Sequence, residues 1–219
     1  MRPPTFPIHL PKGATMPQKI MLKACAMLLL GCTSAVAAAA SQETIVLVRH
    51  GEKPAGGYGQ LDCQGFNRAL ALPNVLGSLY GTPTTIYAPD PHADKISDPA
   101  GDFDYVRPLA TIEPTAIRYG LPVHTPDGYT QIDKLQKHLL DKKLENATVF
   151  VAWEHKELVK LTKNLIDAAG GNSSVVPKWS DDDFDSIYVV TLRHDGGATT
   201  ASFQHGHENL NSQSQTCPP

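Results

Sequence analysis

Residues 45–54, I-V-L-V-R-H-G-E-K-P, join an apolar run to a basic pair. Four branched apolar residues end abruptly at Arg49, His50 and Gly51. Such a run is typical of a short strand that is buried on both faces of a parallel sheet. In open α/β sheets, ligands bind at the edge where the carboxyl ends of the strands lie. The stretch therefore predicts an α/β fold with a site at the end of this strand.

The three residues that end the run suit an anionic ligand. Arg49 offers a planar fork of donors that matches phosphate geometry. His50 offers an imidazole that can act as a nucleophile or transfer a proton. Gly51 allows a sharp turn and a close approach of a ligand to the backbone. In the alternative interpretation, Arg49 and His50 lie at a strand end and pair with surface carboxylates.

Strands and helices alternate along the rest of the chain. Further strands are predicted at 84–88, 121–124, 147–153, 187–192 and 198–204, and helices at 65–72, 75–79, 108–119, 127–140 and 156–169. Pro73 is expected to separate the first two helical pieces, and residues 89–106 are expected to form one long polar loop. The turn at 194–197, H-D-G-G, indicates an antiparallel hairpin at the sheet edge. The pattern predicts a three-layer α/β sandwich with a mostly parallel central sheet and helices on both faces.

The net charge of the chain argues against a nucleic-acid-binding protein. The chain has 219 residues with 19 Lys and Arg and 22 Asp and Glu. Four of the basic residues and none of the acidic ones lie in the first forty, so residues 41–219 hold 15 basic against 22 acidic residues, a net charge of −7. An acidic surface argues against nucleic-acid binding, and any anion site must be a local basic pocket.

Residues 1–40 are typical of an export segment. Lys19 and Lys23 precede the apolar residues 24–30, and a run of small residues ends at Ala40. The sequence predicts cleavage near Ala40, a domain over 41–219, and a periplasmic or extracellular protein. Alternatives are lipidation at Cys32, which would attach the protein to a membrane, and a retained anchor. Met16 is an alternative start.

Two cysteines remain after the leader, Cys63 and Cys217. In an oxidising compartment they form a natural pair that would tie the C-terminal tail to the first loop. The alternative is two unrelated thiols.

The basic residues come from three places in the chain. The second strongly buried strand ends in Glu154 and His155, and Arg107 opens the helix that follows the long loop. In the alternative interpretation, Arg107 is a surface arginine at a helix start, and His155 is a helix-cap histidine that contacts no ligand. The chain resembles the histidine phosphatase superfamily, which has the phosphoglycerate-mutase-like fold. The resemblance covers roughly residues 44–190.

Four motifs carry this resemblance, and they occur in the order found in the family. They are Arg49-His50-Gly51, Gly65-Phe66-Asn67-Arg68-Ala69, Arg107 with Thr111 and Ala116, and Trp153-Glu154-His155 in a form seen in an exported bacterial subgroup. The triplet alone is weakly specific, whereas the ordered set is strongly specific.

The resemblance implies a covalent phosphatase mechanism. His50 would attack a phosphoryl group, and water would hydrolyse the phosphohistidine. Arg49, Arg107 and His155 would hold the phosphoryl oxygens. The resemblance implies no metal and no other cofactor. The sequence H-G-H at 205–207 is expected to be an exposed strand end rather than a metal site.

The sequence does not decide which residue is the general acid. One acid-phosphatase branch has an aspartate directly after the second histidine, where this chain has Lys156. Glu154 and Asp127 are the two candidates for protonating the leaving group. The alternative for both is a carboxylate that only orients the histidine or the arginines.

The sequence therefore predicts an exported enzyme that hydrolyses a small phosphorylated substrate. A non-catalytic protein that binds a phosphorylated ligand is the alternative from another class. A mutase-type phosphotransferase is less expected, because export would separate it from glycolytic intermediates.

Overall fold

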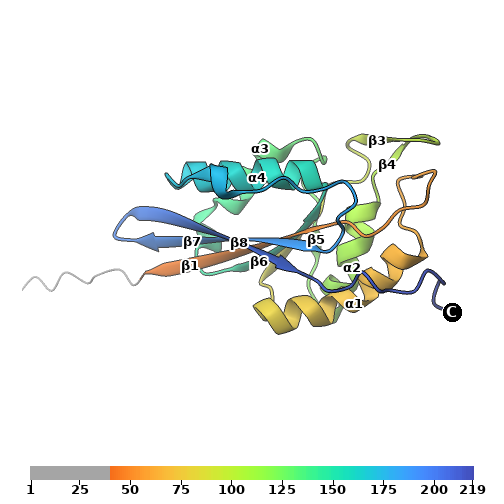
Figure 1. Cartoon of the computed structure of the whole chain (residues 1–219). Coiled ribbons are helices and arrows are strands. Elements are labelled where there is room, and N and C mark those ends of the chain that lie inside the picture. Colours follow the sequence, from red (N-terminus) through yellow and green to blue (C-terminus); the bar gives the residue numbers. More distant parts are fainter. Residues whose placement is uncertain (1–39) are drawn as a thin grey trace, which may run out of the picture. The chain divides into compact units, whose positions relative to one another are not determined.

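The computed structural model describes residues 40–219, so the predicted leader and Cys32 lie outside the described residues. A six-stranded sheet forms the centre, in the order β5-β2-β6-β1-β7-β8 (Figure 1). Its strands are β1 (Ser41–Arg49), β2 (Thr85–Tyr87), β5 (Val123–His124), β6 (Thr148–Trp153), β7 (Ser186–Asp195) and β8 (Ala198–His207). The first four in this order are parallel, and β7 and β8 form an antiparallel hairpin at the edge. The predicted fold class is confirmed.

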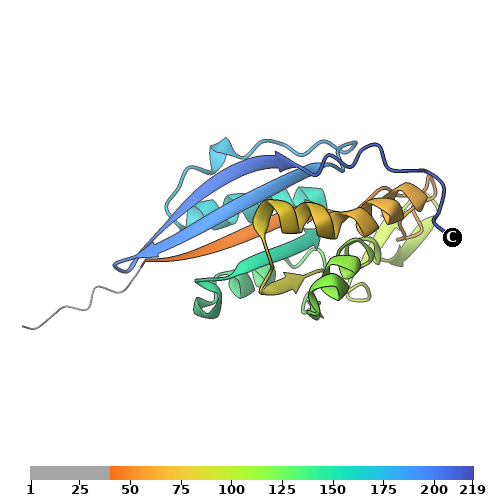
Figure 2. The ribbon, with the colours of Figure 1, turned by 90° about the horizontal axis from the view of Figure 1, so that it is seen from below.

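Two helices cover each face of the sheet. Helices α1 (Cys63–Tyr80) and α2 (Arg107–Tyr119) lie on one face, and α3 (Ile132–Leu139) and α4 (His155–Ala168) on the other (Figure 1). Figure 2, seen from below, shows α1 and α2 side by side in front of the sheet. The alternation of side chains along β1 explains these layers. Ile45 and Leu47 pack into the core with α3 and α4, whereas Val46 and Val48 pack into the core with α1 and α2.

Helix α1 runs unbroken through Pro73, so the predicted interruption was wrong. A proline inside a helix removes one backbone hydrogen bond and crowds the preceding turn. Here Leu72, Pro73 and Leu76 are all buried. Packing of Leu72 and Leu76 against the sheet outweighs the local penalty, because tertiary packing supplies most of the stability of helices in proteins.

Two further segments differ from the sequence prediction. Residues 89–106 include a two-stranded hairpin, β3 (Lys95–Asp98) and β4 (Gly101–Asp104), rather than one irregular loop. Helix α3 begins at Ile132 rather than at Asp127. The carbonyl of Asp127 instead accepts a hydrogen bond from the N–H of Asp90, at 2.8 Å, which ties the two loops together.

The predicted disulfide is confirmed: Cys63 is bonded to Cys217. Next to it, the side-chain amide of Asn67 donates to the carbonyls of Ser214 and Thr216, both at 2.8 Å. The C-terminal tail is therefore fixed along α1. Over residues 40–219, no helix is long and apolar enough to cross a membrane.

Candidate active site

Four basic side chains from three elements meet at the carboxyl edge of the sheet. Arg49 ends β1 and His50 follows it, His155 opens α4 one residue after β6, and Arg107 opens α2. Strands β1 and β6 are parallel neighbours, with Arg49 opposite Trp153, so their ends lie side by side. All four side chains are buried, and the charges of Arg107, Arg49 and His155 all act on the pKa of His50. The structure brings together the basic residues that the sequence singled out.

The backbone fixes the tautomer of His50. Its Nδ1 lies 2.7 Å from the carbonyl oxygen of Gly51 and donates to it. This leaves Nε2 with the free lone pair. Burial, followed by the positive charges of Arg107 and Arg49, holds the pKa of His50 well below its usual value. The imidazole is therefore neutral at neutral pH and can act as a nucleophile.

Gly51 is required at its position by a close backbone contact. A Cβ added there would lie 2.8 Å from the Cα of Gly65, at the start of α1. The N–H of Gly51 donates to the hydroxyl of Thr111 at 2.9 Å, and that hydroxyl donates to the carbonyl of Arg107 at 2.8 Å. The carbonyl that orients His50 is thus held in place by both α1 and α2.

Arg49 is held by the loop before β7. Its Nη1 donates to the carbonyls of Ser180, Asp181 and Asp183 at 2.7–3.3 Å. Its guanidinium lies 3.9 Å from the ring centroid of Phe184. Its Nε is buried and has no hydrogen-bond partner among residues 40–219.

Arg107 shows the same pattern. Its Nη1 donates to Asp98 of β3 at 2.7 Å, while its buried Nε has no partner within the described part of the chain. The neighbouring Tyr105 is 1% exposed, contacts His50 edge-on at 5.8 Å between ring centroids, and has a buried hydroxyl that is also unpartnered among residues 40–219. Buried donors are nearly always paired in folded proteins. The unpaired donors of Arg49, Arg107 and Tyr105 are therefore available to a ligand, and the charges of the two arginines suit an anion.

His155 lies between two carboxylates. Its Nε2 is 2.7 Å from Oδ1 of Asp181, and its Nδ1 is 2.7 Å from Oε1 of Glu154, the latter a close contact without hydrogen-bond alignment. Oε2 of Glu154 accepts from the N–H of Glu157 at 2.8 Å, so Glu154 also caps α4. Burial raises the pKa of Glu154, but the contacts with His155 and with the Glu157 N–H outweigh burial and leave it below its usual value. Glu154 is therefore ionised at neutral pH and orients His155.

Asp127, the other candidate acid, is buried near α3. Its Oδ2 lies 3.1 Å from Nε2 of His138, and its carbonyl holds Asp90. These contacts link it to α3 and the 89–106 segment rather than to the four basic side chains.

The sequence reasoning missed four residues that shape this site: Tyr105, Asp98, Asp181 and Phe184. Tyr105 carried a usable signal, because it is an apolar ring with a polar tip only two positions before Arg107. The other three lie in polar segments whose course depends on tertiary contacts. Nothing in their local sequence marks them.

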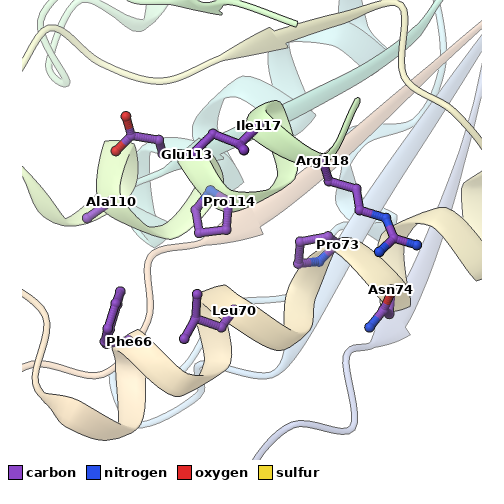
Figure 3. Close-up of a pocket in the computed structure, with 9 residues that line it drawn as sticks. All are labelled: Phe66, Leu70, Pro73, Asn74, Ala110, Glu113, Pro114, Ile117 and Arg118. Carbon is purple, nitrogen blue, oxygen red and sulfur yellow. The ribbon is translucent and has the colours of Figure 1, made fainter. Parts of the chain in front are cut away.

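A separate apolar groove of about 590 Å³ lies between α1 and α2. Figure 3 shows Phe66, Leu70 and Pro73 of α1 facing Pro114 and Ile117 of α2. None of the four basic residues lines it. The groove is therefore not part of the candidate active site.

His205 and His207 lie at the exposed end of β8, as expected. Nε2 of His205 is 2.7 Å from the hydroxyl of Ser186. Within residues 40–219, no group of three or more His, Cys, Asp or Glu side chains is arranged to hold a metal ion.

Comparisons with known proteins give matches in structure alone. No family model matches the chain. No curated protein matches its sequence.

Solved structures do match. A mycobacterial glucosyl-3-phosphoglycerate phosphatase with inorganic phosphate is 16% identical, with a TM-score of 0.49 and coverage of 80% of this chain and 99% of that one. A protein of Nakamurella multipartitia assigned as the phosphohistidine phosphatase SixA is 13% identical, with a TM-score of 0.48 and coverage of 77% and 98%. A variant phosphoserine phosphatase of Entamoeba histolytica with phosphoserine is 15% identical, with a TM-score of 0.44 and coverage of 77% and 98%. What this site can do follows from its own residues.

Proposed function

We propose that the protein hydrolyses phosphomonoesters through a phosphohistidine on His50. One observation carries this proposal: the buried donors Arg49 Nε, Arg107 Nε and Tyr105 Oη lack partners among the described residues and lie around a neutral imidazole whose Nε2 is free. A tetrahedral anion with several oxygens satisfies such a set of donors. The structural neighbours that are phosphatases agree with it.

In the first step, Nε2 of His50 attacks the phosphorus in line with the ester oxygen. The P–N bond forms as the P–O bond breaks, and the leaving oxygen takes up a proton. The guanidinium groups of Arg49 and Arg107 stabilise the charge on the equatorial oxygens, with His155 as a third donor. In the second step, water attacks the phosphorus, which releases phosphate and returns His50 to its neutral form.

Glu154 is our first candidate for the proton transfer, because its charge acts on Arg49 and Tyr105 and its side chain contacts His155. Its lowered pKa makes it a weak source of protons at neutral pH. We therefore expect aryl phosphates, whose leaving groups need little protonation, to react faster than alkyl phosphates. Glu154→Gln should widen this difference, and Asp127→Asn should not.

The purified protein tests the proposal when it is given an activated aryl phosphate. We expect turnover in the parent protein and its loss in His50→Ala, with the fold checked by circular dichroism. Binding of vanadate without turnover would instead support the alternative, a non-catalytic protein that binds a phosphorylated ligand.

We also propose that the protein is exported, with a leader cleaved near Ala40. The basic and apolar pattern of residues 19–40 and the disulfide between Cys63 and Cys217 support export. Cell fractionation tests it, and mass spectrometry of the mature N-terminus distinguishes cleavage after Ala40 from lipidation at Cys32.

A further inference from the structure

One exposed carboxylate, that of Asp181, contacts His155 at the edge of the candidate active site. Oδ1 of Asp181 lies 2.7 Å from Nε2 of His155 and 3.1 Å from Nζ of Lys156. The carbonyl of the same residue accepts from Arg49 at 2.7 Å. A single residue thus places anionic and polar oxygens on three basic groups at the mouth of the site.

The side chain of Asp181 is held weakly. It is 70% exposed, and so is the side chain of Lys156. Ion pairs between exposed groups contribute little, because water screens them and both side chains lose freedom. A substrate anion can therefore displace this carboxylate and take over its donors.

A cavity of about 470 Å³ adjoins this point; none of the four basic residues lines it, and it meets the site through Asp181, which contacts His155. Its wall contains two lysines, Lys156 and Lys178, and two apolar surfaces, Trp179 and Val159, with Asp181 at the border to His155. The indole of Trp179 is fixed, since its Nε1 donates to the carbonyl of Asp183 at 3.0 Å. The cavity therefore combines a rigid apolar wall with two cationic side chains.

We propose that this cavity is the subsite for the leaving group of the substrate, and that it selects leaving groups carrying a second anionic group. The proposal rests on the proposed phosphatase function. The phosphoryl group lies among His50, Arg49, Arg107 and His155, and the second anion replaces Asp181 on Lys156 and is met by Lys178. Because His155 and Lys156 contact the same oxygen of Asp181, the two anionic groups of the substrate are only a few bonds apart.

The test compares two substrates that differ only in charge: meta-carboxyphenyl phosphate and meta-carbamoylphenyl phosphate. We expect kcat/KM to favour the carboxylate roughly tenfold, as expected of hydrogen bonds to charged groups. Lys156→Gln with Lys178→Gln should lower kcat/KM for the carboxylate to about that for the carboxamide and so abolish this preference. Asp181→Asn should lower KM for the carboxylate, because the competing charge is gone.

Lys160→Gln is the matched control, since Lys160 is an exposed lysine on the same helix that faces Asp133 at 4.0 Å and does not line the cavity. Three results would overturn the proposal. The parent protein could show no preference for the carboxylate, the double variant could keep the preference, or Lys160→Gln could remove it equally well.

Binding of the corresponding benzylphosphonates, measured by calorimetry on the parent protein, separates this proposal from the proposed function. Preferential binding of the carboxylate without turnover of either ester means that the phosphatase function fails and the subsite stands. Turnover of both esters with equal binding of both phosphonates means that the function stands and the subsite fails. If neither phosphonate binds and neither ester is turned over, both proposals fail.

Discussion

Two buried arginines of this protein lie in opposite environments. Arg68 of α1 donates to Glu208 at 2.7 Å, to Asp185 at 3.2 Å, to Glu52 at 2.6 Å and to the side-chain oxygen of Asn211 at 3.0 Å. All three of its nitrogens have partners. It joins α1 to the ends of β7 and β8 and to the C-terminal tail.

Arg107 is equally buried, but it has one carboxylate partner, Asp98, and its Nε has none among the described residues. Arg49 shares this incomplete pairing. Burial of a cation does not by itself mark a binding site. Unpaired donors that lie beside a possible nucleophile such as His50 are a more specific sign, because an unpaired buried donor is unfavourable until a ligand satisfies it.

The largest expected effect is on stability, at Arg68. Arg68→Met leaves three acidic side chains in a buried cluster without their cation. We expect the free energy of unfolding to fall by about 3–5 kcal/mol. Urea denaturation followed by circular dichroism measures it.

The control is Arg118→Met, which removes an exposed arginine at the end of α2. It should change the free energy of unfolding by less than about 0.5 kcal/mol. A loss of under about 1 kcal/mol in Arg68→Met would show that the cluster is not the structural element that its contacts suggest.

The second effect is on catalysis, at Arg107. The double variant Arg107→Gln with Asp98→Asn removes the cation together with its buried partner. We expect kcat/KM for an aryl phosphate to fall about 10²–10³-fold, because a donor to the transition state is lost. Steady-state kinetics measures it.

Thermal unfolding with vanadate sharpens the comparison, because a ligand that binds the native state raises Tm. The rise in Tm should be lost in the Arg107 and Asp98 double variant and retained in Arg68→Met. If vanadate raises Tm in both variants, or in neither, the two arginines do not differ in ligand binding.

The smallest effect concerns Glu43, a buried carboxylate of β1 with no arginine partner among the described residues. Burial, followed by the charge of Glu145, raises its pKa to about 8. The folded state therefore holds a proton that the unfolded chain releases, and stability falls as pH rises from the ordinary pKa of Glu toward 8. The slope is at most about 1.4 kcal/mol per pH unit.

Glu43→Gln should flatten this pH dependence, as measured by urea denaturation between pH 5 and about 8. Glu113→Gln, at an exposed position on α2, should leave it unchanged. An equal slope in the parent protein and in Glu43→Gln would assign the dependence to other groups.

The sequence predicted the layers of the fold and the convergence of His50, Arg49, Arg107 and His155. These predictions depend on local patterns: an apolar run that ends in basic residues, and parallel strands whose carboxyl ends share one edge. These predictions do not depend on the contacts that the other side chains make.

Other features could not be predicted in this way, because they depend on contacts between distant segments. Arg68 is fully buried because Glu52, Asp185 and Glu208 reach it from three other segments. The unbroken course of α1 through Pro73 likewise depends on packing against the sheet. The identity of the general acid belongs to this class, because it depends on pKa values such as that of Glu154, which burial raises and the contacts with His155 and Glu157 lower.

The central claim is that His50 carries a covalent phosphoryl group during turnover. Rapid quenching into alkali during hydrolysis of an aryl phosphate preserves phosphohistidine, and mass spectrometry of the peptides then locates it. We predict one added phosphoryl group on the peptide containing His50 in the parent protein, and none in His50→Ala. Turnover without a phosphorylated His50 peptide, or equal labelling of the His155 peptide in His50→Ala, would contradict the mechanism.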